Sequence, residues 1–181
     1  MAQDVLAAAV GRWLLALGAV LAPLGVGAQE PARAGVAGVV AGILSYTRWP
    51  AEPSPIKLCT LGRGGAVDEL NRSLDLGSAQ RQVVVQALRG STPRRGDCDA
   101  LFVGATDAAG TRVVLRELAG QPVLVLGQGS EFCSDGGMFC LEDAGGSKVR
   151  FQANLDAIAR SGLRVHPQVL RIARSTPGGA P

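Results

Sequence analysis

Residues 100–127 of this 181-residue chain read ALFVGATDAAGTRVVLRELAGQPVLVLG, and this stretch decides the fold. Its two ends, Ala100–Gly104 (ALFVG) and Pro122–Gly127 (PVLVLG), are continuous apolar runs. Such runs are typical of strands that are covered on both faces, as in a parallel sheet. The segment between them is long enough for a crossover connection and is expected to be helical near Ala109–Leu118. The stretch therefore predicts a β-α-β unit and a domain of the α/β class.

Two further strands are expected before this unit. They are Pro55–Gly62 (PIKLCTLG) and Arg81–Leu88 (RQVVVQAL). Gly64 and Gly65 are expected to turn the chain into a short helix near Ala66–Leu74, because glycine pairs commonly mark turns. The order strand, helix, strand is repeated here, which supports the α/β class.

The first helix of the domain is indicated by an apolar stripe. Its members recur at helical spacing on one face and are Val36, Val39, Val40, Ile43 and Leu44. Pro50 is expected to stop this helix, because the residue before a proline avoids the helical region.

A hairpin is expected after the central unit. The strands Met138–Glu142 and Lys148–Ala153 flank a turn at Gly145 and Gly146. Apolar and polar residues alternate in the second strand, so one of its faces is expected to be exposed to water. A glycine turn between two such strands predicts an antiparallel pair.

Two short helices are expected to close the domain. Asn154 is a suitable N-cap for Leu155–Ser161, and Gly162 is a suitable stop. His166 precedes Pro167, which fits an N-cap followed by proline at the first helical position. The apolar face of this last helix is expected to consist of Val169, Leu170 and Ala173.

Composition agrees with one folded unit. Hydrophobic residues make up 47% of the chain and charged residues 18%, so a core is expected and wholesale disorder is not. The elements together predict a single compact α/β domain with a mixed sheet of about five to six strands and helices on both faces.

Residues 1–28 have the pattern of an export signal. Arg12 precedes the apolar run Trp13–Val26, which is shorter than the span of about 20 residues that a membrane-crossing helix needs. Val26, Gly27 and Ala28 supply the small residues of a cleavage site. We therefore expect a signal peptide that is cleaved after Ala28, with retention as an anchor helix as the alternative.

The chain after residue 28 is expected to consist of one domain and a short tail. Residues 29–174 are predicted to form the α/β domain. Residues 175–181 (STPGGAP) are predicted to be a disordered tail, because terminal segments rich in glycine and proline are rarely ordered. Removal of the leader would release the protein into the periplasm.

Four cysteines are expected to form two disulfides, because their number is even and an exported chain meets an oxidising compartment. Cys133 and Cys140 lie seven residues apart around a glycine pair, so a local loop closes easily and leaves Cys59 to pair with Cys98. A zinc site and a redox-active pair are less favoured, because the chain has no C-x₂-C pair. A buried free pair at Cys59 and Cys98 is the remaining alternative.

Nucleic-acid binding is not indicated by the charges. The net charge is +3, but the 18 basic residues are scattered, and Arg94 and Arg95 are the only adjacent pair. No aromatic residues interleave with them, as they would on a surface that stacks bases. We therefore expect no nucleic-acid partner.

Catalytic patterns are also sparse. His166 is the only histidine, and no serine or cysteine nucleophile pattern accompanies it. Asp97 and Asp99 flank Cys98 and are interpreted as turn carboxylates rather than as an acid/base pair. We therefore expect neither an enzyme nor a cofactor, with a hydrolase or a disulfide enzyme as the disfavoured alternatives.

A glycine-rich loop follows one predicted strand. Gly62, Arg63, Gly64 and Gly65 lie where a dinucleotide-binding loop begins a helix. Val67 occupies the place of the third glycine of G-x-G-x-x-G, however, so nucleotide binding is not expected.

Five segments carry a family resemblance. They are Gly42–Pro50 (GILSYTRWP), Leu58–Gly62 (LCTLG), Cys98–Val103 (CDALFV), Phe132–Leu141 (FCSDGGMFCL) and Val149–Leu170 (VRFQANLDAIARSGLRVHPQVL). In this order they are similar to the YfiR family of periplasmic repressors, over nearly all of the expected mature chain. The four cysteines also resemble the two-disulfide arrangement of that family.

The resemblance implies a specific role. It implies a periplasmic repressor that binds the periplasmic domain of an inner-membrane diguanylate cyclase and holds it inactive, which lowers cyclic di-GMP and restrains biofilm formation. It further implies sequestration by an OmpA-like outer-membrane lipoprotein, dimer formation, and activity that depends on the redox state of the cysteines. A periplasmic sensor that binds a small molecule at the sheet edge is the alternative function.

Six residues are candidates for contact with a partner or ligand. Trp49 lies beside Arg48 in the segment 45–50, which also carries Tyr46, and tyrosine, tryptophan and arginine often dominate interface energies. The resemblance implies that a groove is lined by Arg48, Gln152, Ile158, Arg164 and His166. The structural alternatives are that Trp49 closes the core at a helix end, that Arg164 lies on a solvated loop and that His166 only begins a helix.

Overall fold

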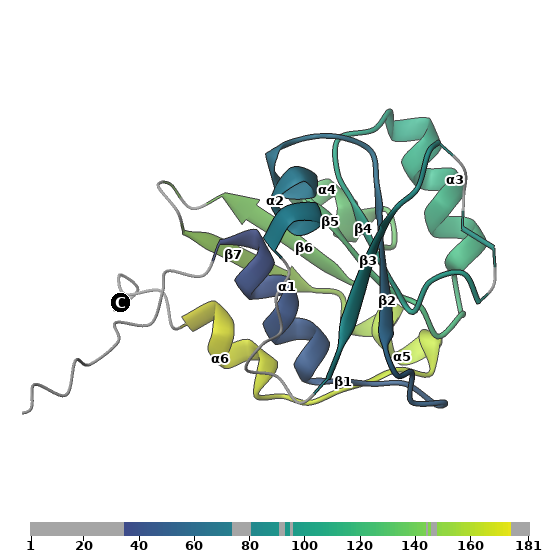
Figure 1. Ribbon diagram of the computed structural model, residues 1–181, viewed down its shortest axis with the longest axis vertical. Helices are drawn as coiled ribbons and strands as arrows, with labels where there is room; N and C mark the ends of the chain where they lie inside the picture. The colour runs from purple at the N-terminus through teal and green to yellow at the C-terminus, as the bar shows by residue number, and fades with distance from the viewer. Residues whose placement is uncertain are drawn as a thin grey trace, which may run out of the picture. The chain divides into compact units, whose positions relative to one another are not determined.

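A six-stranded sheet forms the centre of the computed structural model (Figure 1). The structure describes residues 35–73, 81–90, 93–94, 96–143, 145 and 148–174. The strands, in spatial order, are β3 (Val83–Ala87), β2 (Ile56–Leu61), β4 (Ala100–Val103), β5 (Leu124–Gln128), β6 (Phe139–Asp143) and β7 (Val149–Ala153). Every neighbouring pair is parallel except β6 and β7, so the sheet is mixed, as predicted.

Helices connect the parallel strands and cover both faces of the sheet. The connecting helices are α2 (Gly65–Ser73), α3 (Ala108–Leu118) and α4 (Ser130–Ser134), and the flanking ones are α1 (Val36–Ser45), α5 (Leu155–Ser161) and α6 (Val169–Arg174). The buried residues of α1, α2, α5 and α6 belong to one core cluster, and those of α3 and α4 to the other. Figure 1 shows α3 on the right of the sheet and α1 and α6 on the left. The predicted α/β class is confirmed.

Strand β4 explains why its sequence is a continuous apolar run. Leu101 and Val103 pack into the cluster under α3, whereas Ala100 and Phe102 pack into the cluster under α1. All four side chains are buried, because successive residues of a strand point to opposite faces and both faces are covered.

The predicted hairpin is present. Strands β6 and β7 pair antiparallel, with Leu141 opposite Phe151. Gly145 in the connection has φ of 89°, a left-handed conformation that glycine adopts without strain.

Helix α5 begins and ends as its sequence predicts. The side chain of Asn154 accepts a hydrogen bond from the Ala157 N–H over 3.0 Å, which caps the first turn. Gly162 follows the last turn with φ of 76°, the left-handed conformation typical of a helix stop.

Helix α1 ends earlier than Pro50 led us to expect. Its last residue is Ser45, and Thr47–Arg48 forms the short strand β1 before the proline is reached. The Thr47 hydroxyl donates to the Ile43 carbonyl oxygen over 2.8 Å, which satisfies an acceptor at the helix end. The prediction was wrong here because side-chain capping and strand pairing end the helix before the proline does.

Helix α6 also differs from its prediction. It begins at Val169, and Leu170 is 46% exposed. Ile172 instead packs against the core beside Val169, whereas the side chain of Ala173 lies outside the described residues. The expected apolar face was therefore wrong at Leu170.

Several predictions fall on residues that the structure does not describe. They are the signal peptide at 1–28 with its cleavage site, residues 29–34 of the predicted domain, Leu74 at the end of the second predicted helix, Gly146 of the predicted hairpin turn, and the tail at 175–181. Within the described part of the chain, none of the helices combines the length and the apolar character that a membrane span requires.

Candidate functional site

A second, two-stranded sheet builds the candidate site at the end of α1. Strand β1 pairs antiparallel with β8 (Arg164–Val165), so that Thr47 lies opposite Val165 and Arg48 lies opposite Arg164. The His166 N–H donates to the Tyr46 carbonyl oxygen over 2.9 Å and extends the pairing. Two segments that are more than a hundred residues apart in the sequence are thereby held side by side.

A pocket of about 450 Å³ opens beside this small sheet. Its walls come from the end of α1, from both short strands and from the turn before α6. The lining residues are Ser45, Tyr46, Arg48, Arg164, Val165, His166, Pro167 and Gln168. This volume lies within the range of small-molecule sites in proteins.

The pocket is positively charged. Arg48 uses its Nη1 to donate to the carbonyl oxygens of Ser45 and Thr47, over 2.9 and 3.1 Å, which holds its guanidinium at the rim. The exposed side chain of Arg164 has no hydrogen-bond or ion-pair partner among the described residues. Among the residues that the structure describes, no carboxylate belongs to the lining. Two guanidinium groups without a counter-charge favour a carboxylate or phosphate group on whatever binds here.

Two aromatic rings lie in the same pocket. The rings of Tyr46 and His166 are stacked, with centroids 6.2 Å apart and an angle of 29° between their planes. The His166 Nδ1 accepts a hydrogen bond from the Gln168 N–H over 3.2 Å, which fixes the orientation of the imidazole. The site thus combines positive charge with an aromatic face, and both are features that recur at protein interfaces.

The six candidate residues do not all meet. Arg48, Arg164 and His166 line the pocket together. Gln152 lies on the exposed face of β7 and donates to the Glu142 carboxylate over 3.1 Å, whereas Ile158 of α5 is buried in the core. Gln152 and Ile158 are therefore not among the residues that line this pocket.

Trp49 is a core residue rather than a pocket residue. Its side chain is 6% exposed, and its Nε1 donates to the Asp99 carbonyl oxygen over 2.9 Å. The Arg81 guanidinium lies 5.9 Å from the centroid of the ring. The structure therefore agrees with the alternative in which Trp49 closes the core beside the site.

Sequence reasoning did not include Ser45, Pro167 or Gln168 in the site. Ser45 lies at the end of α1, and Pro167 and Gln168 lie in the turn before α6. Helix α1 ends earlier and helix α6 begins later than the sequence predicted. Single residues at a helix end or in a turn carry no periodic signal, so only their position beside Arg48 and His166 reveals them.

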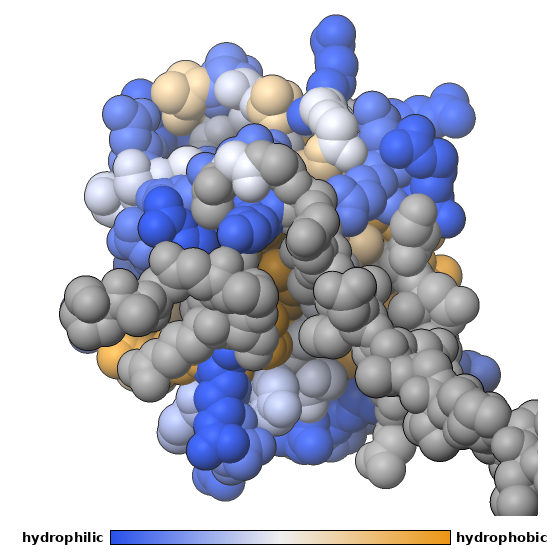
Figure 2. Space-filling view, turned by 90° about the vertical axis from the view of Figure 1, so that its left-hand side faces the viewer, coloured by the Kyte–Doolittle hydropathy of each residue, from blue (hydrophilic) through white to orange (hydrophobic). Residues whose placement is uncertain are grey.

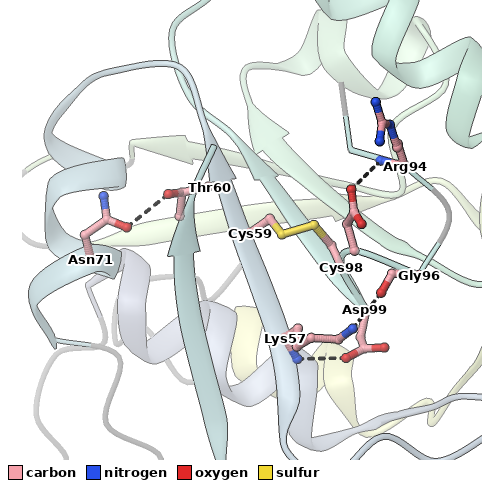
Figure 3. The surroundings of a disulfide bond; sticks show 9 residues. Lys57, Cys59, Thr60, Asn71, Arg94, Gly96, Cys98 and Asp99 are labelled. Atoms are coloured by element: carbon pink, nitrogen blue, oxygen red, sulfur yellow. Dashed lines mark hydrogen bonds between the residues drawn. A yellow bond between two sulfur atoms is a disulfide. The ribbon is translucent and has the colours of Figure 1, made fainter. Parts of the chain in front are cut away.

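The cysteines form the two expected disulfides, Cys59–Cys98 and Cys133–Cys140. The first joins the middle of β2 to the residue that precedes Asp99 and β4 (Figure 3). No cysteine is free, and the described residues contain no group of side chains suited to a metal ion. The alternatives of a zinc site and of a free cysteine pair are excluded by the bonded sulfurs.

The carboxylates beside Cys98 are structural. The Asp99 side chain accepts from the Lys57 N–H over 2.8 Å (Figure 3). The Asp97 side chain accepts from the Arg94 N–H over 2.8 Å. The Lys57 ammonium group also donates to the Gly96 carbonyl oxygen. These contacts hold the segment that carries Cys98 and agree with the interpretation of turn carboxylates.

The crevice where ligands commonly bind in this class of sheet is closed here. The strand order reverses between β2 and β4, and the carboxyl ends of strands at such a point usually hold the ligand. Arg63 and Ala105, which follow these strands, exchange two backbone hydrogen bonds of 3.2 and 2.8 Å. The glycine loop at 62–65 is therefore sealed against the neighbouring strand end, which argues against nucleotide binding there.

Comparison with protein families agrees with this architecture. A family model described as YfiR/HmsC-like matches residues 34–174, which include every described strand and helix. The chain belongs to the YfiR/HmsC-like family. YfiR-like proteins are periplasmic regulators of diguanylate cyclase signalling, and the family is regulatory rather than catalytic. The pocket beside β1 and β8 lies within the matched region of this YfiR-like chain.

Proposed function

We propose that this protein is a negative regulator that binds the periplasmic domain of an inner-membrane diguanylate cyclase and keeps the cyclase inactive. Binding would lower cyclic di-GMP and restrain biofilm formation. The observation that carries the proposal is the match to the YfiR/HmsC-like family over residues 34–174.

The positively charged pocket is the proposed contact surface. Arg48 and Arg164 present two guanidinium groups beside the stacked rings of Tyr46 and His166. Arginine and aromatic residues are enriched among the side chains that dominate binding energies. An acidic side chain of the cyclase domain is the chemistry that would complement this surface.

Inhibition would follow from differential affinity. A protein shifts the equilibrium between two conformations of its partner only by as much as its affinities for them differ. We propose that this chain binds the inactive conformation of the cyclase domain more tightly than the active one.

A binding measurement tests the proposal. The full mature chain is titrated into the purified periplasmic domain of a membrane cyclase encoded beside it, and the affinity is compared with that of Arg164→Glu. We expect the variant to bind at least about tenfold more weakly, which corresponds to about 1.4 kcal/mol. Arg112→Glu on α3 is the matched control, because Arg112 is exposed and α3 covers the opposite face of the sheet.

Two results would overturn the proposal. One is the absence of binding to such a domain together with unchanged cyclic di-GMP after deletion of the gene. The other is an equal loss of affinity in Arg112→Glu and Arg164→Glu, which would remove the pocket from the interface.

A second function is favoured by the size of the pocket. A volume of about 450 Å³ with two arginines and an aromatic face suits a small anionic molecule, so the protein would act as a periplasmic sensor. Thermal shift assays with aromatic carboxylates and nucleoside monophosphates test this alternative. Stabilisation that is lost in Arg164→Glu and retained in Arg112→Glu would support it.

We also propose the processing and the second partner that the sequence implies. The signal peptide at 1–28 is cleaved after Ala28, and residues 29–174 form the mature domain ahead of the tail at 175–181. An OmpA-like outer-membrane lipoprotein sequesters the protein and relieves repression. Intact mass measurement of the periplasmic protein tests the cleavage site, and competition between the lipoprotein and the cyclase domain tests sequestration.

A further inference from the structure

A second pocket lies where α3, α4 and α5 end, and it shares no lining residue with the pocket beside β1 and β8. Its walls come from the last turn of α3, from the loop that follows α4 and from α5. A Cβ at Gly120, just after α3, would lie 3.9 Å from the Arg160 carbonyl oxygen of α5, so the ends of these two helices are neighbours. Helix α3 lies on the right of Figure 1, whereas Figure 2 shows the left-hand side, whose coloured surface is mostly hydrophilic.

The lining of this second pocket includes an apolar surface from the core. Five of its side chains are at most 7% exposed, and they are Leu115, Leu118, Val125, Met138 and Ala157. Met138 and Ala157 belong to one core cluster and the other three to the second, so the two clusters meet here. The volume of about 130 Å³ is well below the usual range of about 300–1,000 Å³ for ligand pockets. The pocket therefore has room for a short aliphatic group and not for a large ring system.

Three charged side chains also line the second pocket, and they do not pair with one another. They are the exposed Arg116, Asp135 and Arg160. Among the described residues, Asp135 and Arg160 have no side-chain hydrogen bond or ion pair. The Arg116 Nε donates to the Arg112 carbonyl oxygen over 3.3 Å, and no carboxylate of the described residues pairs with its guanidinium. Groups of both signs are thus available to a ligand at one apolar cavity.

The walls of the second pocket are held in place without a ligand. The Asn154 Nδ2 donates to the Cys133 carbonyl oxygen over 3.0 Å, and its Oδ1 accepts from the Ala157 N–H over 3.0 Å. One side chain therefore ties α4 to α5. The Cys133–Cys140 disulfide closes the loop that carries Asp135. A site whose walls are already ordered loses little affinity to the ordering of its own side chains and loops.

We propose that this pocket binds a small zwitterion, namely an α-amino acid with a short aliphatic side chain such as leucine. The carboxylate of the ligand is bound by the guanidinium groups of Arg116 and Arg160, which are suited to planar carboxylates. Its ammonium group is bound by the Asp135 carboxylate, and its aliphatic side chain contacts the apolar lining. The inference does not depend on the proposed function.

The arrangement of charges favours a zwitterion over ligands of other classes. A purely apolar ligand would remove water from three charged groups without giving them a partner, which is unfavourable. A purely anionic ligand would place its charge beside Asp135, and like charges repel. A ligand with both charges next to a short aliphatic group complements all parts of the lining.

Calorimetric titration of L-leucine into the mature chain tests the proposal. We expect binding in the millimolar range, as for a ligand of this size. Two analogues remove one charge each, since 4-methylpentanoate lacks the ammonium group and 3-methylbutylamine lacks the carboxylate. Each analogue is expected to bind at least about tenfold more weakly, because hydrogen bonds to charged groups contribute more than neutral ones.

Variants of the lining locate the site. We expect Asp135→Asn and Arg160→Gln each to weaken leucine binding at least about tenfold with an unchanged circular dichroism spectrum. Arg112→Gln is the matched control on α3, because Arg112 is exposed and does not line the pocket. Arg164→Gln is the control for the pocket beside β1 and β8. Both controls are expected to bind leucine as the wild type does.

Amide spectra from nuclear magnetic resonance provide a second measurement of the location. We expect leucine to shift the amide signals of Gly120 and Gly136, which line the second pocket, and to leave that of His166 unchanged.

Four outcomes would overturn the inference. They are the absence of leucine binding to the wild type, equal affinity for leucine and 4-methylpentanoate, unchanged affinity in both Asp135→Asn and Arg160→Gln, and a loss of affinity in Arg164→Gln. The last result would assign leucine to the pocket beside β1 and β8. Because these experiments contain only this chain and small molecules, they succeed or fail independently of binding to a cyclase.

Discussion

The indole Nε1 of Trp49 donates a hydrogen bond of 2.9 Å to the main-chain oxygen of Asp99, the residue that follows Cys98. The same oxygen also accepts from the Leu124 N–H over 3.0 Å. One carbonyl group therefore connects the segment after β1, the start of β4 and the start of β5. Because Trp49 directly follows Arg48, this hydrogen bond holds the pocket wall at Arg48 against the end of the sheet near the Cys59–Cys98 disulfide.

Replacing Trp49 is expected to reduce stability more than binding. Trp49→Phe removes the hydrogen bond but keeps an aromatic ring, and the Asp99 oxygen retains its bond from Leu124. We expect the free energy of unfolding to fall by about 1–2 kcal/mol, the value of one hydrogen bond and some lost packing. Trp49→Ala is expected to cost about 3–5 kcal/mol because it also leaves a cavity.

Urea denaturation monitored by circular dichroism measures both Trp49 variants. Titration of Trp49→Phe with the cyclase domain is the control for a direct contact. If Trp49→Phe bound the cyclase domain as weakly as Arg164→Glu does, Trp49 would contact the cyclase directly. That result would contradict its interpretation as a core residue.

The two disulfides are expected to stabilise the fold unequally. They close loops with sequence separations of 39 for Cys59–Cys98 and 7 for Cys133–Cys140. The chain-entropy model gives about 4 kcal/mol for the longer loop and about 2.5 kcal/mol for the shorter one. We therefore expect the Cys59→Ala/Cys98→Ala variant to melt at a lower temperature than Cys133→Ala/Cys140→Ala, and both to melt below the wild type.

Calorimetry of the wild type and of both variants under non-reducing conditions tests the disulfide prediction. A separate scan of the wild type with a reducing agent is the control in which both loops are open. Unchanged melting in Cys133→Ala/Cys140→Ala would show that the shorter loop does not stabilise the domain.

Arg164→Glu is expected to make the protein more stable while it weakens binding. Arg48 and Arg164 are directly opposite across β1 and β8, and like charges in this position are destabilising. The substitution places opposite charges there, so we expect the free energy of unfolding to rise by up to about 1 kcal/mol. A gain in stability that accompanies a loss of affinity is typical of residues retained for function.

Chemical denaturation of Arg164→Glu and of the Arg112→Glu control measures this effect. The gain is expected to disappear in 1 M salt, which screens exposed charges. A loss of stability in Arg164→Glu at low salt would contradict the repulsion between the two arginines.

Gly104 is expected to be essential for the closed crevice between β2 and β4. A Cβ at this position would overlap the Val67 side chain and would lie 2.6 Å from the Arg63 carbonyl oxygen, which is part of the backbone bridge to Ala105. Gly104→Ala is therefore expected to cost about 1–3 kcal/mol, the range of overpacked sites.

Gly65→Ala is the matched control for Gly104→Ala. Apart from its chain neighbours and the backbone of its own helix, no described atom lies within 4 Å of a Cβ at Gly65, at the start of α2. The stability of the Gly65→Ala variant should therefore be unchanged or slightly higher than that of the wild type. Thermal unfolding of the two variants makes the comparison. Equal stability of both would contradict a tightly closed crevice.

Much of the fold follows from local patterns. The apolar runs at 100–104 and 122–127 correspond to β4 and β5, and the stripe from Val36 to Leu44 corresponds to the buried face of α1. Strands covered on both faces and amphipathic helices each have a periodicity that the sequence displays directly. The caps of α5 were predictable for the same reason, since Asn154 and Gly162 act on neighbouring residues.

The candidate site was predictable only in part. The resemblance to the YfiR family indicated Arg48, Arg164 and His166, which line one pocket, but it also grouped Gln152 and Ile158 with them. Gln152 points outward from β7 and Ile158 points into the core. A residue's position in a motif does not specify the direction of its side chain.

The sequence by itself determined the α/β class through residue types and their spacing, favoured the observed disulfide partners, and indicated the family by resemblance. Only the tertiary structure decided that Thr47–Arg48 pairs with Arg164–Val165 and that two arginines face each other there. A strand of two residues has no periodicity to detect, and its partner lies more than a hundred residues away. The pocket therefore exists only after the packing of α1, α5 and the sheet has brought these two short segments together.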